Sequence, residues 1–216
     1  MLSVDCPIDL RYYAAQARLK AEGGRNMAHI LLVKGSPRER GNSSALADQA
    51  AVGARAAGAS VETVSLHRLQ ISGCDGCDAC AATGEFCIIQ DDMQGLYPKL
   101  LEADAVLLAS PIYWFTYTAQ LKLFIDRLYG LWNNRPHFLR GKPVGVILTY
   151  GDSDLYNSGG INAIHTFETM SRFLEAPIAG FVHGTAGGPG DAEKNPDLMR
   201  AARDLGARLA GAQAGV

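Results

Sequence analysis

The sequence predicts an α/β fold in which a five-stranded parallel β-sheet carries helices on both faces, forming a three-layer sandwich. Apolar runs of strand length recur along the chain, and segments with helical spacing or helix-capping residues separate them. No internal repeat or interdomain linker interrupts the 216 residues. Short apolar strands of this kind are buried on both faces, and right-handed crossovers favour the strand order 2-1-3-4-5. We therefore expect an N-terminal arm at 1–26 and one domain at 27–216.

The first elements follow from an apolar run and an alanine-rich segment. His29–Lys34 has the length and composition of a buried strand, and it ends at the turn residues Gly35–Pro37. Asn42–Ser44 offer N-caps for a helix from Ala45 to about Ala57. Val61–Leu66 alternates between apolar and polar residues, which favours a second strand.

The remaining elements alternate in the same way. Asp91 and Asp92, at the start of the next helix, suit the positive end of the helix dipole, and we interpret them as helix caps and not as ligands. Apolar residues recur with helical spacing in the helix after it. In chain order, we predict a helix at Asp91–Leu101, a strand at Ala105–Ala109, a helix carrying Leu121, Phe124, Ile125 and Leu128, a strand at Val144–Thr149, a helix that begins near Ser158–Ile161, a strand at Ile178–Val182 and a helix at Pro196–Ala212.

The composition excludes several classes of protein. Apolar residues make up 48% and charged residues 19%, which is typical of a globular chain. The net charge of −2 and the scattered Lys and Arg residues indicate no nucleic-acid partner, and no apolar run approaches the ~20 residues of a membrane helix. The arm at 1–26 is charged throughout and lacks the apolar core of a signal peptide, so we expect a cytoplasmic protein. The arm itself is predicted to be polar and partly helical, either dispensable for the chemistry or a dimer-contacting extension.

In sheets of this order, ligands bind beyond the carboxyl ends of the strands, which nominates the loops 35–44, 110–118 and 150–160. The first loop leads into a helix N-terminus, where N–H groups and the helix dipole favour an anion. Because no GxxxxGK[ST] or GxGxxG pattern is present, we expect a terminal phosphate monoester there. An ordinary polar turn with capping residues is the alternative. The candidate phosphate-binding residues are Ser36, Arg38, Asn42, Ser43 and Ser44.

The second loop brings three consecutive aromatic residues to the ligand edge of the predicted sheet. A flat heterocycle edged with hydrogen-bonding atoms, such as isoalloxazine, suits aromatic side chains and backbone groups. A hydrophobic plug or a dimer interface is the alternative interpretation. The candidate ring-binding residues are Pro111, Ile112, Tyr113, Trp114 and Phe115.

Two segments, GSPRERGNSS and SPIYWFTYTAQLKLFIDRLYG, give the chain a family resemblance. In these segments, and over roughly 27–212, the chain resembles the NADPH-dependent FMN reductase family of flavodoxin-like proteins. The resemblance implies a flavodoxin-like fold, with the FMN phosphate held by the first loop and the flavin ring packed along the second. It also implies that Tyr150 and Gly151 approach the other side of the ring.

The resemblance further implies a homodimer or homotetramer. The helix carrying Lys122 and Asp126 would then lie near the interface between subunits. These two residues are spaced i and i+4, so they are equally expected to form an ion pair on a solvated helix face.

Four cysteines fall within a short segment after the second predicted strand, in a loop that opens at the same sheet edge as the ligand loops. Without an export signal, such thiols indicate ligands or catalytic groups before disulfides. Closely spaced thiolates suit a four-iron four-sulfur cluster, and the segment resembles the compact motif of the iron–sulfur flavoproteins, a branch of the same family. Free or redox-active thiols and a zinc site are the alternatives. The candidate ligands are Cys74, Cys77, Cys80 and Cys87.

The leading functional hypothesis is an FMN-dependent oxidoreductase that takes electrons from NAD(P)H and passes them to a quinone, a flavin or a similar small acceptor. The flavin carries the chemistry in such enzymes, so no side chain is assigned as catalytic. An iron–sulfur flavoprotein that exchanges single electrons with a protein partner is the second hypothesis, and a non-catalytic flavin-binding regulator is the third.

Overall fold

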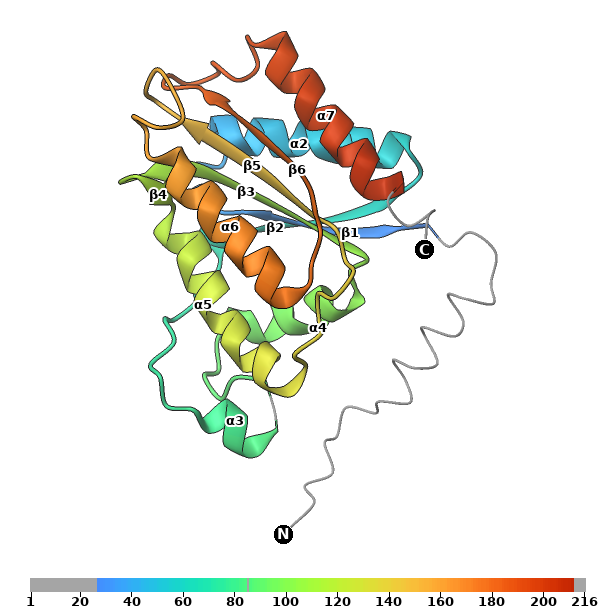
Figure 1. Cartoon of the computed structure of the whole chain (residues 1–216), viewed down its shortest axis with the longest axis vertical. Helices are drawn as coiled ribbons and strands as arrows, with labels where there is room; N and C mark the ends of the chain where they lie inside the picture. Colours follow the sequence, from blue (N-terminus) through green and yellow to red (C-terminus); the bar gives the residue numbers. More distant parts are fainter. Residues whose placement is uncertain (1–26, 85, 212–216) are drawn as a thin grey trace.

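Five parallel strands form the sheet, in the order β2-β1-β3-β5-β6 (Figure 1). The predicted order 2-1-3-4-5 is confirmed, because β5 and β6 are the fourth and fifth parallel strands along the chain. The computed structural model describes residues 27–84 and 86–211, so the predicted N-terminal arm lies outside the described residues. The parallel strands are β1 (His29–Lys34), β2 (Ser60–Ser65), β3 (Ala105–Tyr113), β5 (Val144–Tyr150) and β6 (Ile178–Thr185).

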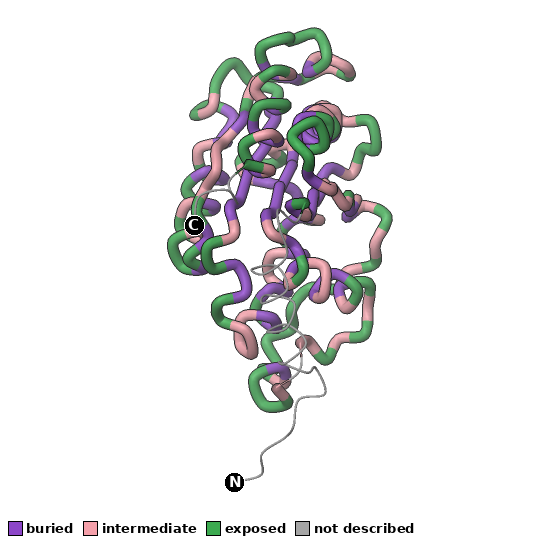
Figure 2. Tube along the Cα trace, turned by 90° about the vertical axis from the view of Figure 1, so that its right-hand side faces the viewer, coloured by how far each residue is buried: buried purple, intermediate pink, exposed green. Residues whose placement is uncertain are grey.

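Helices cover both faces of the sheet, as expected for strands that are apolar throughout. On one face lie α2 (Asn42–Ala56) and α7 (Pro196–Gly211), and on the other lie α4 (Leu96–Glu102), α5 (Ala119–Asn134) and α6 (Gly160–Leu174) (Figure 1). Figure 2 shows buried residues along the central strands and exposed residues on the outer loops. The fold is therefore a three-layer sandwich.

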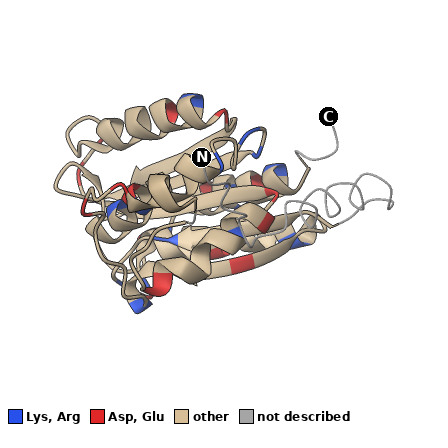
Figure 3. Cartoon of the chain, turned by 90° about the horizontal axis from the view of Figure 1, so that it is seen from below, with Lys and Arg blue, Asp and Glu red and all other residues tan. Residues whose placement is uncertain are grey.

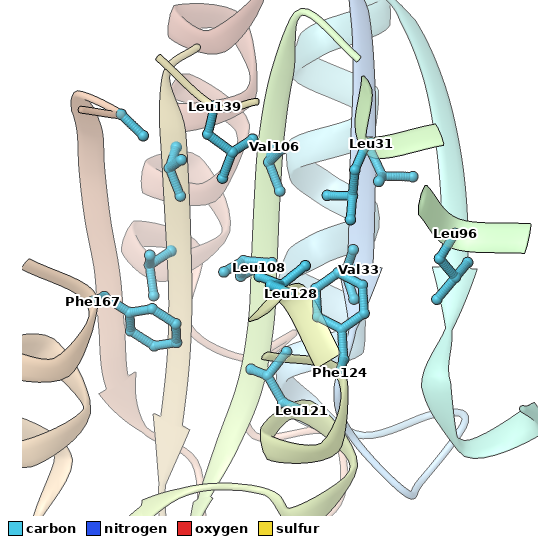
Figure 4. Packing of buried hydrophobic residues seen from close by; sticks show 14 of the residues in the cluster. Leu31, Val33, Leu96, Val106, Leu108, Leu121, Phe124, Leu128, Leu139 and Phe167 are labelled. Atoms are coloured by element: carbon cyan, nitrogen blue, oxygen red, sulfur yellow. The ribbon is translucent and has the colours of Figure 1, made fainter. Parts of the chain in front are cut away.

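The strands alternate their side chains between two hydrophobic clusters. Leu31 and Val33 of β1 belong to the cluster under α4, α5 and α6, whereas Ile30 and Leu32 belong to the cluster under α2 and α7. Figure 4 shows part of the first cluster, with Phe124 of α5 lying against strand side chains such as Val33. Both faces of β1 are thus buried, which explains its uninterrupted apolar sequence.

The sequence prediction missed a short hairpin at the end of β3. This strand continues to Tyr113, beyond its predicted end at Ala109, because it pairs with the antiparallel strand β4 (Thr116–Tyr117). Trp114 and Phe115 form the two-residue turn between these strands. They carry none of the Gly, Asn or Asp residues that normally announce such a turn.

Two helix starts also differ from the predictions. Asn42–Ser44 lie in the first turn of α2, and Gly41 is its N-cap, without a side-chain hydrogen bond. The helix predicted at Asp91–Leu101 is divided into a 3₁₀ turn, η2 (Asp92–Gly95), and α4. Asp91 caps η2 by accepting a hydrogen bond from the Met93 N–H, as its interpretation as a cap predicted.

The distribution of charged and apolar residues agrees with the predictions made from the composition. Lys and Arg residues are interspersed with Asp and Glu residues over the ribbon in Figure 3. Within 27–84 and 86–211, no helix has both the length and the apolar character needed to cross a membrane.

Candidate functional site

A cleft opens beyond the carboxyl ends of the strands, where the strand order predicted a ligand site. It has two parts, of about 220 Å³ and about 250 Å³, and we call them together the cofactor cleft. The two parts adjoin each other, because Ile112, Tyr150 and Gly151 line both. The first part is also lined by Ser36, Arg38, Gly41, Asn42, Ser43, Pro111, Tyr113, Thr149, Ala186 and Gly187, and the second by Trp114, Phe115, Asp152, Asn157 and Ser158.

The loop after β1 is closed on itself by Ser36. The Ser36 hydroxyl accepts a hydrogen bond from the Arg38 N–H and donates one to the Arg38 carbonyl oxygen, both at 3.1 Å. A Cβ atom at Gly41 would lie 2.9 Å from the Ser36 hydroxyl, so only glycine fits there without a shift. The loop therefore turns tightly and leaves the exposed Arg38 side chain on the wall of the cleft.

The N-terminus of α2 forms part of the same wall. The first hydrogen bond of the helix runs from the Ala45 N–H to the Gly41 carbonyl oxygen, so the N–H groups of residues 42–44 have no acceptor within the helix. No side chain caps this end, and its first turn holds no acidic residue. Unpaired N–H groups at the positive end of a 15-residue helix make an anion-binding site.

Asn42 and Ser44, both predicted to bind the phosphate, make other contacts in the folded chain. The Asn42 amide donates both hydrogens, to the carbonyl oxygens of Ala186 and Gly188 at 2.8 Å each, and its oxygen accepts from the Ala192 N–H. Asn42 thus fixes the loop after β6, and its amide hydrogens are already in use. Ser44 is buried and lines neither part of the cleft, whereas Ser43 is buried and lines the first part.

The aromatic residues lie on the hairpin between β3 and β4. Trp114 and Phe115 have φ angles of 47° and 66°, in the left-handed region that bulky residues rarely adopt. The Phe115 carbonyl oxygen accepts a hydrogen bond from the Asn162 side chain, and a Cβ at Gly159 would overlap Phe115. The start of α6 thus holds the turn, and the Trp114 side chain projects into solvent with 91% of its surface exposed.

Tyr150 links the two parts of the cleft and has a partner that the sequence analysis did not identify. Its hydroxyl lies 3.0 Å from His183 Nδ1 on β6. Burial, and then the Asp154 charge, raise the pKa of Tyr150, while burial lowers the pKa of His183. At neutral pH this pair is therefore uncharged.

The loop after β6 was also missed as a wall of the cleft. Ala186 and Gly187 follow the last strand, whose carboxyl end meets the same sheet edge as the other loops. Gly187 and Gly151 approach each other closely, since a Cβ at Gly187 would lie 3.4 Å from the Gly151 Cα. The strand order could have nominated this loop, but its sequence holds no distinctive ligand-binding residue.

The four cysteines of the loop after β2 line one small pocket against α5, which we call the cysteine pocket. Cys80, in the short helix α3 (Ala79–Thr83), is buried, Cys87 is half-buried, and Cys74 and Cys77 are exposed. The pocket measures about 10 Å³, and no three His, Cys, Asp or Glu side chains of the described residues form a metal-binding group. The donor set for a cluster is therefore gathered at one place, and the loop must open to admit one.

Asp75 governs the chemistry of the exposed Cys77 thiol. The Ala79 N–H acts to lower the pKa of Cys77, but the hydrogen bond and charge of Asp75 raise it overall, above the ordinary value of 9.0. The Cys77 thiol is accordingly protonated at neutral pH in this form of the loop.

A buried ion pair fastens the cysteine loop to α5. Arg127 Nη1 lies 2.6 Å from Asp91 Oδ2, and the two side chains are 0% and 8% exposed. The Arg127 guanidinium also donates to the carbonyl oxygens of Ser72 and Ile89, on either side of the cysteines. Both ends of the loop are therefore held by one side chain.

The cysteine pocket lies far from the cofactor cleft. The loop leaves β2 at the predicted sheet edge but runs along α5, and its cysteines contact Gly130 and Asn133 in the second half of that helix (Figure 1). At 1.5 Å per residue, these contacts lie roughly 15–20 Å along α5 from its start beside the aromatic hairpin. The expectation that the cysteine loop shares the sheet edge of the cleft therefore holds for the start of the loop and not for its thiols.

Comparisons with known proteins agree with this architecture. The sequence model of the family "NADPH-dependent FMN reductase" matches residues 28–180. An iron–sulfur flavoprotein of Archaeoglobus fulgidus is 37% identical over 184 residues, which cover 82% of this chain and 77% of that protein. A Bacillus subtilis protein, whose name describes an NAD(P)H-dependent FMN-containing oxidoreductase, is 30% identical over 185 residues, covering 82% of this chain and 95% of its own.

A solved structure supports the same conclusion. The Trp repressor binding protein of Bacillus subtilis superposes with a TM-score of 0.63 at 28% identity, covering 82% of this chain and 98% of that one. The family model spans more than half of the chain, and the first relative exceeds 30% identity over most of it. The chain therefore belongs to the NADPH-dependent FMN reductase family, as a flavodoxin-like flavin oxidoreductase.

Proposed function

We propose that the cofactor cleft binds FMN, and that the protein uses it to pass electrons from NAD(P)H to a quinone, a flavin or a similar small acceptor. One observation carries the proposal: the N-terminal end of α2 and the aromatic hairpin line two adjoining parts of one cleft, which share three lining residues. FMN has a phosphate at one end and a flat ring at the other, so it matches both ends of this cleft.

The first part of the cleft suits the phosphate. The Arg38 guanidinium and the N–H groups of residues 42–44 offer charge and hydrogen-bond donors, and the hydroxyls of Ser36 and Ser43 lie on the same wall. Asn42 contributes indirectly, by holding the loop that carries Ala186 and Gly187.

The second part suits the flavin ring. Ile112 and Tyr150 would pack along it, the close approach of Gly151 and Gly187 leaves backbone groups within its reach, and Trp114 and Phe115 form the outer wall. When bound, FMN would supply the redox chemistry between NAD(P)H and the second substrate. The residues of this chain bind and orient the partners at a reacting distance of ~3–3.5 Å, and none needs to act as a general acid.

The test is cofactor binding followed by turnover. Purified protein, loaded with FMN if colourless, should oxidise NADH or NADPH when menadione, free FMN or ferricyanide is added, and stopped-flow reduction of the bound flavin should precede reduction of the acceptor. A protein that does not bind added FMN, or whose bound flavin neither nucleotide reduces, would contradict the proposal. Binding without reduction would favour the regulator hypothesis.

The cysteine pocket favours a second candidate function, an iron–sulfur flavoprotein that exchanges single electrons with a partner. Four thiols line one pocket, and four thiolates are the usual ligand set of a four-iron four-sulfur cluster. Relatives named iron–sulfur flavoproteins, including the Archaeoglobus protein, support this proposal. Cys74, Cys77, Cys80 and Cys87 would each bind one iron atom, and the cluster would supply one-electron transfer.

Metal analysis distinguishes the interpretations of the cysteines. Protein purified without oxygen should contain iron and acid-labile sulfide, whereas zinc or no metal would favour the alternatives. Cys77→Ser should lose the iron and keep FMN, because its pocket is separate from the cofactor cleft. Cys6→Ser is the matched control, since Cys6 lies outside this cysteine segment, and it should keep both cofactors. Loss of FMN from Cys77→Ser would mean that the loop is needed for folding.

The homodimer or homotetramer stays a prediction that light scattering after gel filtration tests. The ion pair expected on α5 is present, with Lys122 Nζ 2.5 Å from Asp126 Oδ1 and the two side chains 54% and 41% exposed. A monomer at all concentrations would contradict the expected assembly.

A further inference from the structure

Arg127 has one hydrogen-bond donor that the folded chain does not use. A guanidinium has five N–H groups. Nη1 donates to Asp91 Oδ2 and to the Ser72 carbonyl oxygen, at 2.6 and 2.9 Å, and Nη2 donates to Asp91 Oδ1 and to the Ile89 carbonyl oxygen, both at 3.2 Å. The fifth group, on Nε, is buried and has no partner among the described residues. A buried donor without a partner costs free energy, so its persistence needs a reason.

The cysteine pocket gives that reason. Arg127 lines this pocket, and it is the only cationic side chain among the described residues that do so. Asp75, Asp78 and Asp126 line it as well, so without Arg127 the charges around four thiols would all be negative. Because Asp91 already pairs with the Arg127 charge, what Arg127 can still offer to a group in the pocket is its unused Nε–H donor.

A different side chain on α5, Asn133, contacts a cysteine sulfur atom. The Asn133 amide donates a hydrogen bond to Cys80 Sγ at 3.4 Å. Between the two donors, Gly130 brings the helix against the loop, since a Cβ there would lie 3.1 Å from Cys87 Cβ. On α5, Gly130 thus allows the cysteine loop to approach closely, and the N–H donors of Arg127 and Asn133 lie three residues before and after it.

We propose that Arg127 and Asn133 are positioning residues that donate N–H hydrogen bonds to sulfur atoms of an iron–sulfur cluster held by Cys74, Cys77, Cys80 and Cys87. The proposal rests on the second candidate function. Arg127 Nε–H is the donor kept for the cluster, and Asn133 keeps its existing bond to Cys80 Sγ. Hydrogen bonds to cluster sulfurs stabilise the reduced, more negative state, so these two residues raise the reduction potential of the cluster.

Spectroscopy of the intact protein tests the hydrogen bond without a substitution. Protein labelled with ¹⁵N at arginine Nε is reduced with dithionite, and the paramagnetic cluster is examined by pulsed EPR. We expect a ¹⁵N coupling, because Arg127 is the only arginine lining the pocket among the described residues. A cluster with normal iron and sulfide content but no such coupling overturns the role of Arg127.

Substitutions test the effect on potential. Asn133→Leu keeps the size of the half-buried side chain but removes its N–H, and Arg127→Lys keeps the charge but removes Nε–H. Both should shift the cluster potential to more negative values at unchanged iron content, and the potential of the bound flavin should stay the same. Gln120→Leu, which removes a half-buried amide from the same helix outside the pocket, is the control.

The outcomes distinguish a failure of this inference from a failure of the proposed iron–sulfur cluster itself. Absence of iron from the wild-type protein overturns the cluster and this inference together. A cluster whose potential is the same in the wild-type protein, Asn133→Leu and Gln120→Leu overturns this inference alone. Asn133→Leu keeps the test decisive if Arg127→Lys fails to fold, because it leaves the buried ion pair intact.

Discussion

Arg38 is the only basic side chain among the described residues that line the cofactor cleft. If it makes a charged hydrogen bond to the phosphate, Arg38→Ala should weaken FMN binding by about 1.5–3 kcal/mol. Titration of apoprotein with FMN, followed by flavin fluorescence, measures this change. Arg40→Ala is the control, since Arg40 is exposed in the same loop but does not line the cleft. Equal affinities of the two variants would remove Arg38 from the site.

Asp91 should make the stability of the protein depend on pH. Burial acts to raise its pKa, but the hydrogen bonds from Arg127, Ser72 and Met93 outweigh this and hold the pKa below the ordinary value of 3.8. A carboxyl group with a lowered pKa stabilises the fold above its ordinary pKa, and this contribution is lost as the pH falls from about 4 through the folded-state pKa. Urea unfolding between pH 7 and pH 2.5 measures the loss.

The variant Asp91→Asn identifies the group responsible. At pH 7 it should cost about 3–5 kcal/mol of unfolding free energy, because it leaves the buried Arg127 charge uncompensated. The difference from the wild-type protein should shrink as the pH falls below 4. Asp48→Asn is the control, since Asp48 forms an exposed ion pair with Lys34. A difference that is constant from pH 7 to pH 2.5 would show that the Asp91 charge is not the cause.

The residue types of the site could be read from the sequence, but several of their partners could not. Ser36, Arg38 and Tyr113 were identified because they occupy loops nominated by the strand order, and they line the cleft. The partners of Asn42 lie 144 or more residues away, and Arg127 lies 36 residues from Asp91. Local spacing carries no signal for such contacts, so Asp91 was interpreted as a cap alone.

At the scale of the element, the hairpin between β3 and β4 stores backbone strain. A left-handed conformation costs roughly 1–2 kcal/mol for each non-glycine residue, and Trp114 and Phe115 both adopt it. The variant Trp114→Asn/Phe115→Gly has the residues that this turn favours, so it should be more stable than the wild-type protein by about 1–2 kcal/mol. It should also bind FMN more weakly, because two aromatic walls of the cleft are removed.

Urea unfolding and FMN titration test both parts of this prediction. Trp114→Phe is the control, because it keeps an aromatic side chain and the strain. A double variant no more stable than Trp114→Phe would show that the turn is not strained. The hairpin was unpredictable for the same reason, since a turn held by Asn162 and the start of α6 needs no turn residues of its own.

At the scale of the whole molecule, two helices on one face of the sheet meet backbone to backbone. A Cβ at Gly206 of α7 would overlap the Ala50 carbonyl oxygen of α2, and a Cβ at Gly53 would overlap the Arg203 carbonyl oxygen. Gly206→Ala should therefore push the helices apart and cost about 1–3 kcal/mol of stability. Because α2 carries the anion-binding N–H groups, FMN affinity should fall as well.

Gly211→Ala provides the comparison for this prediction. Gly211 ends the same helix, and a Cβ there would meet nothing within 4 Å. Its substitution should leave the thermal midpoint and FMN affinity unchanged. A midpoint equal to wild type for Gly206→Ala would mean that the contact between α2 and α7 yields without cost.

The topology was the most predictable property, because apolar runs such as His29–Lys34 mark strands buried on both faces and few strand orders remain. The course of the cysteine loop was not predictable. The loop is held by Arg127 and Gly130 of α5, which lie 38 or more residues after Ile89 at the end of the loop and contact it only in the folded state.

The side-chain amide of Asn42 joins the start of α2, after the first strand, to the loop between the last strand and α7. Its bonds reach the Ala186 carbonyl oxygen and the Ala192 N–H, 144 and 150 residues further on. Whatever binds at the start of α2 therefore also stiffens the approach to α7. Ligand binding in the cleft should therefore slow amide exchange at the start of α2 and in the loop before α7 together.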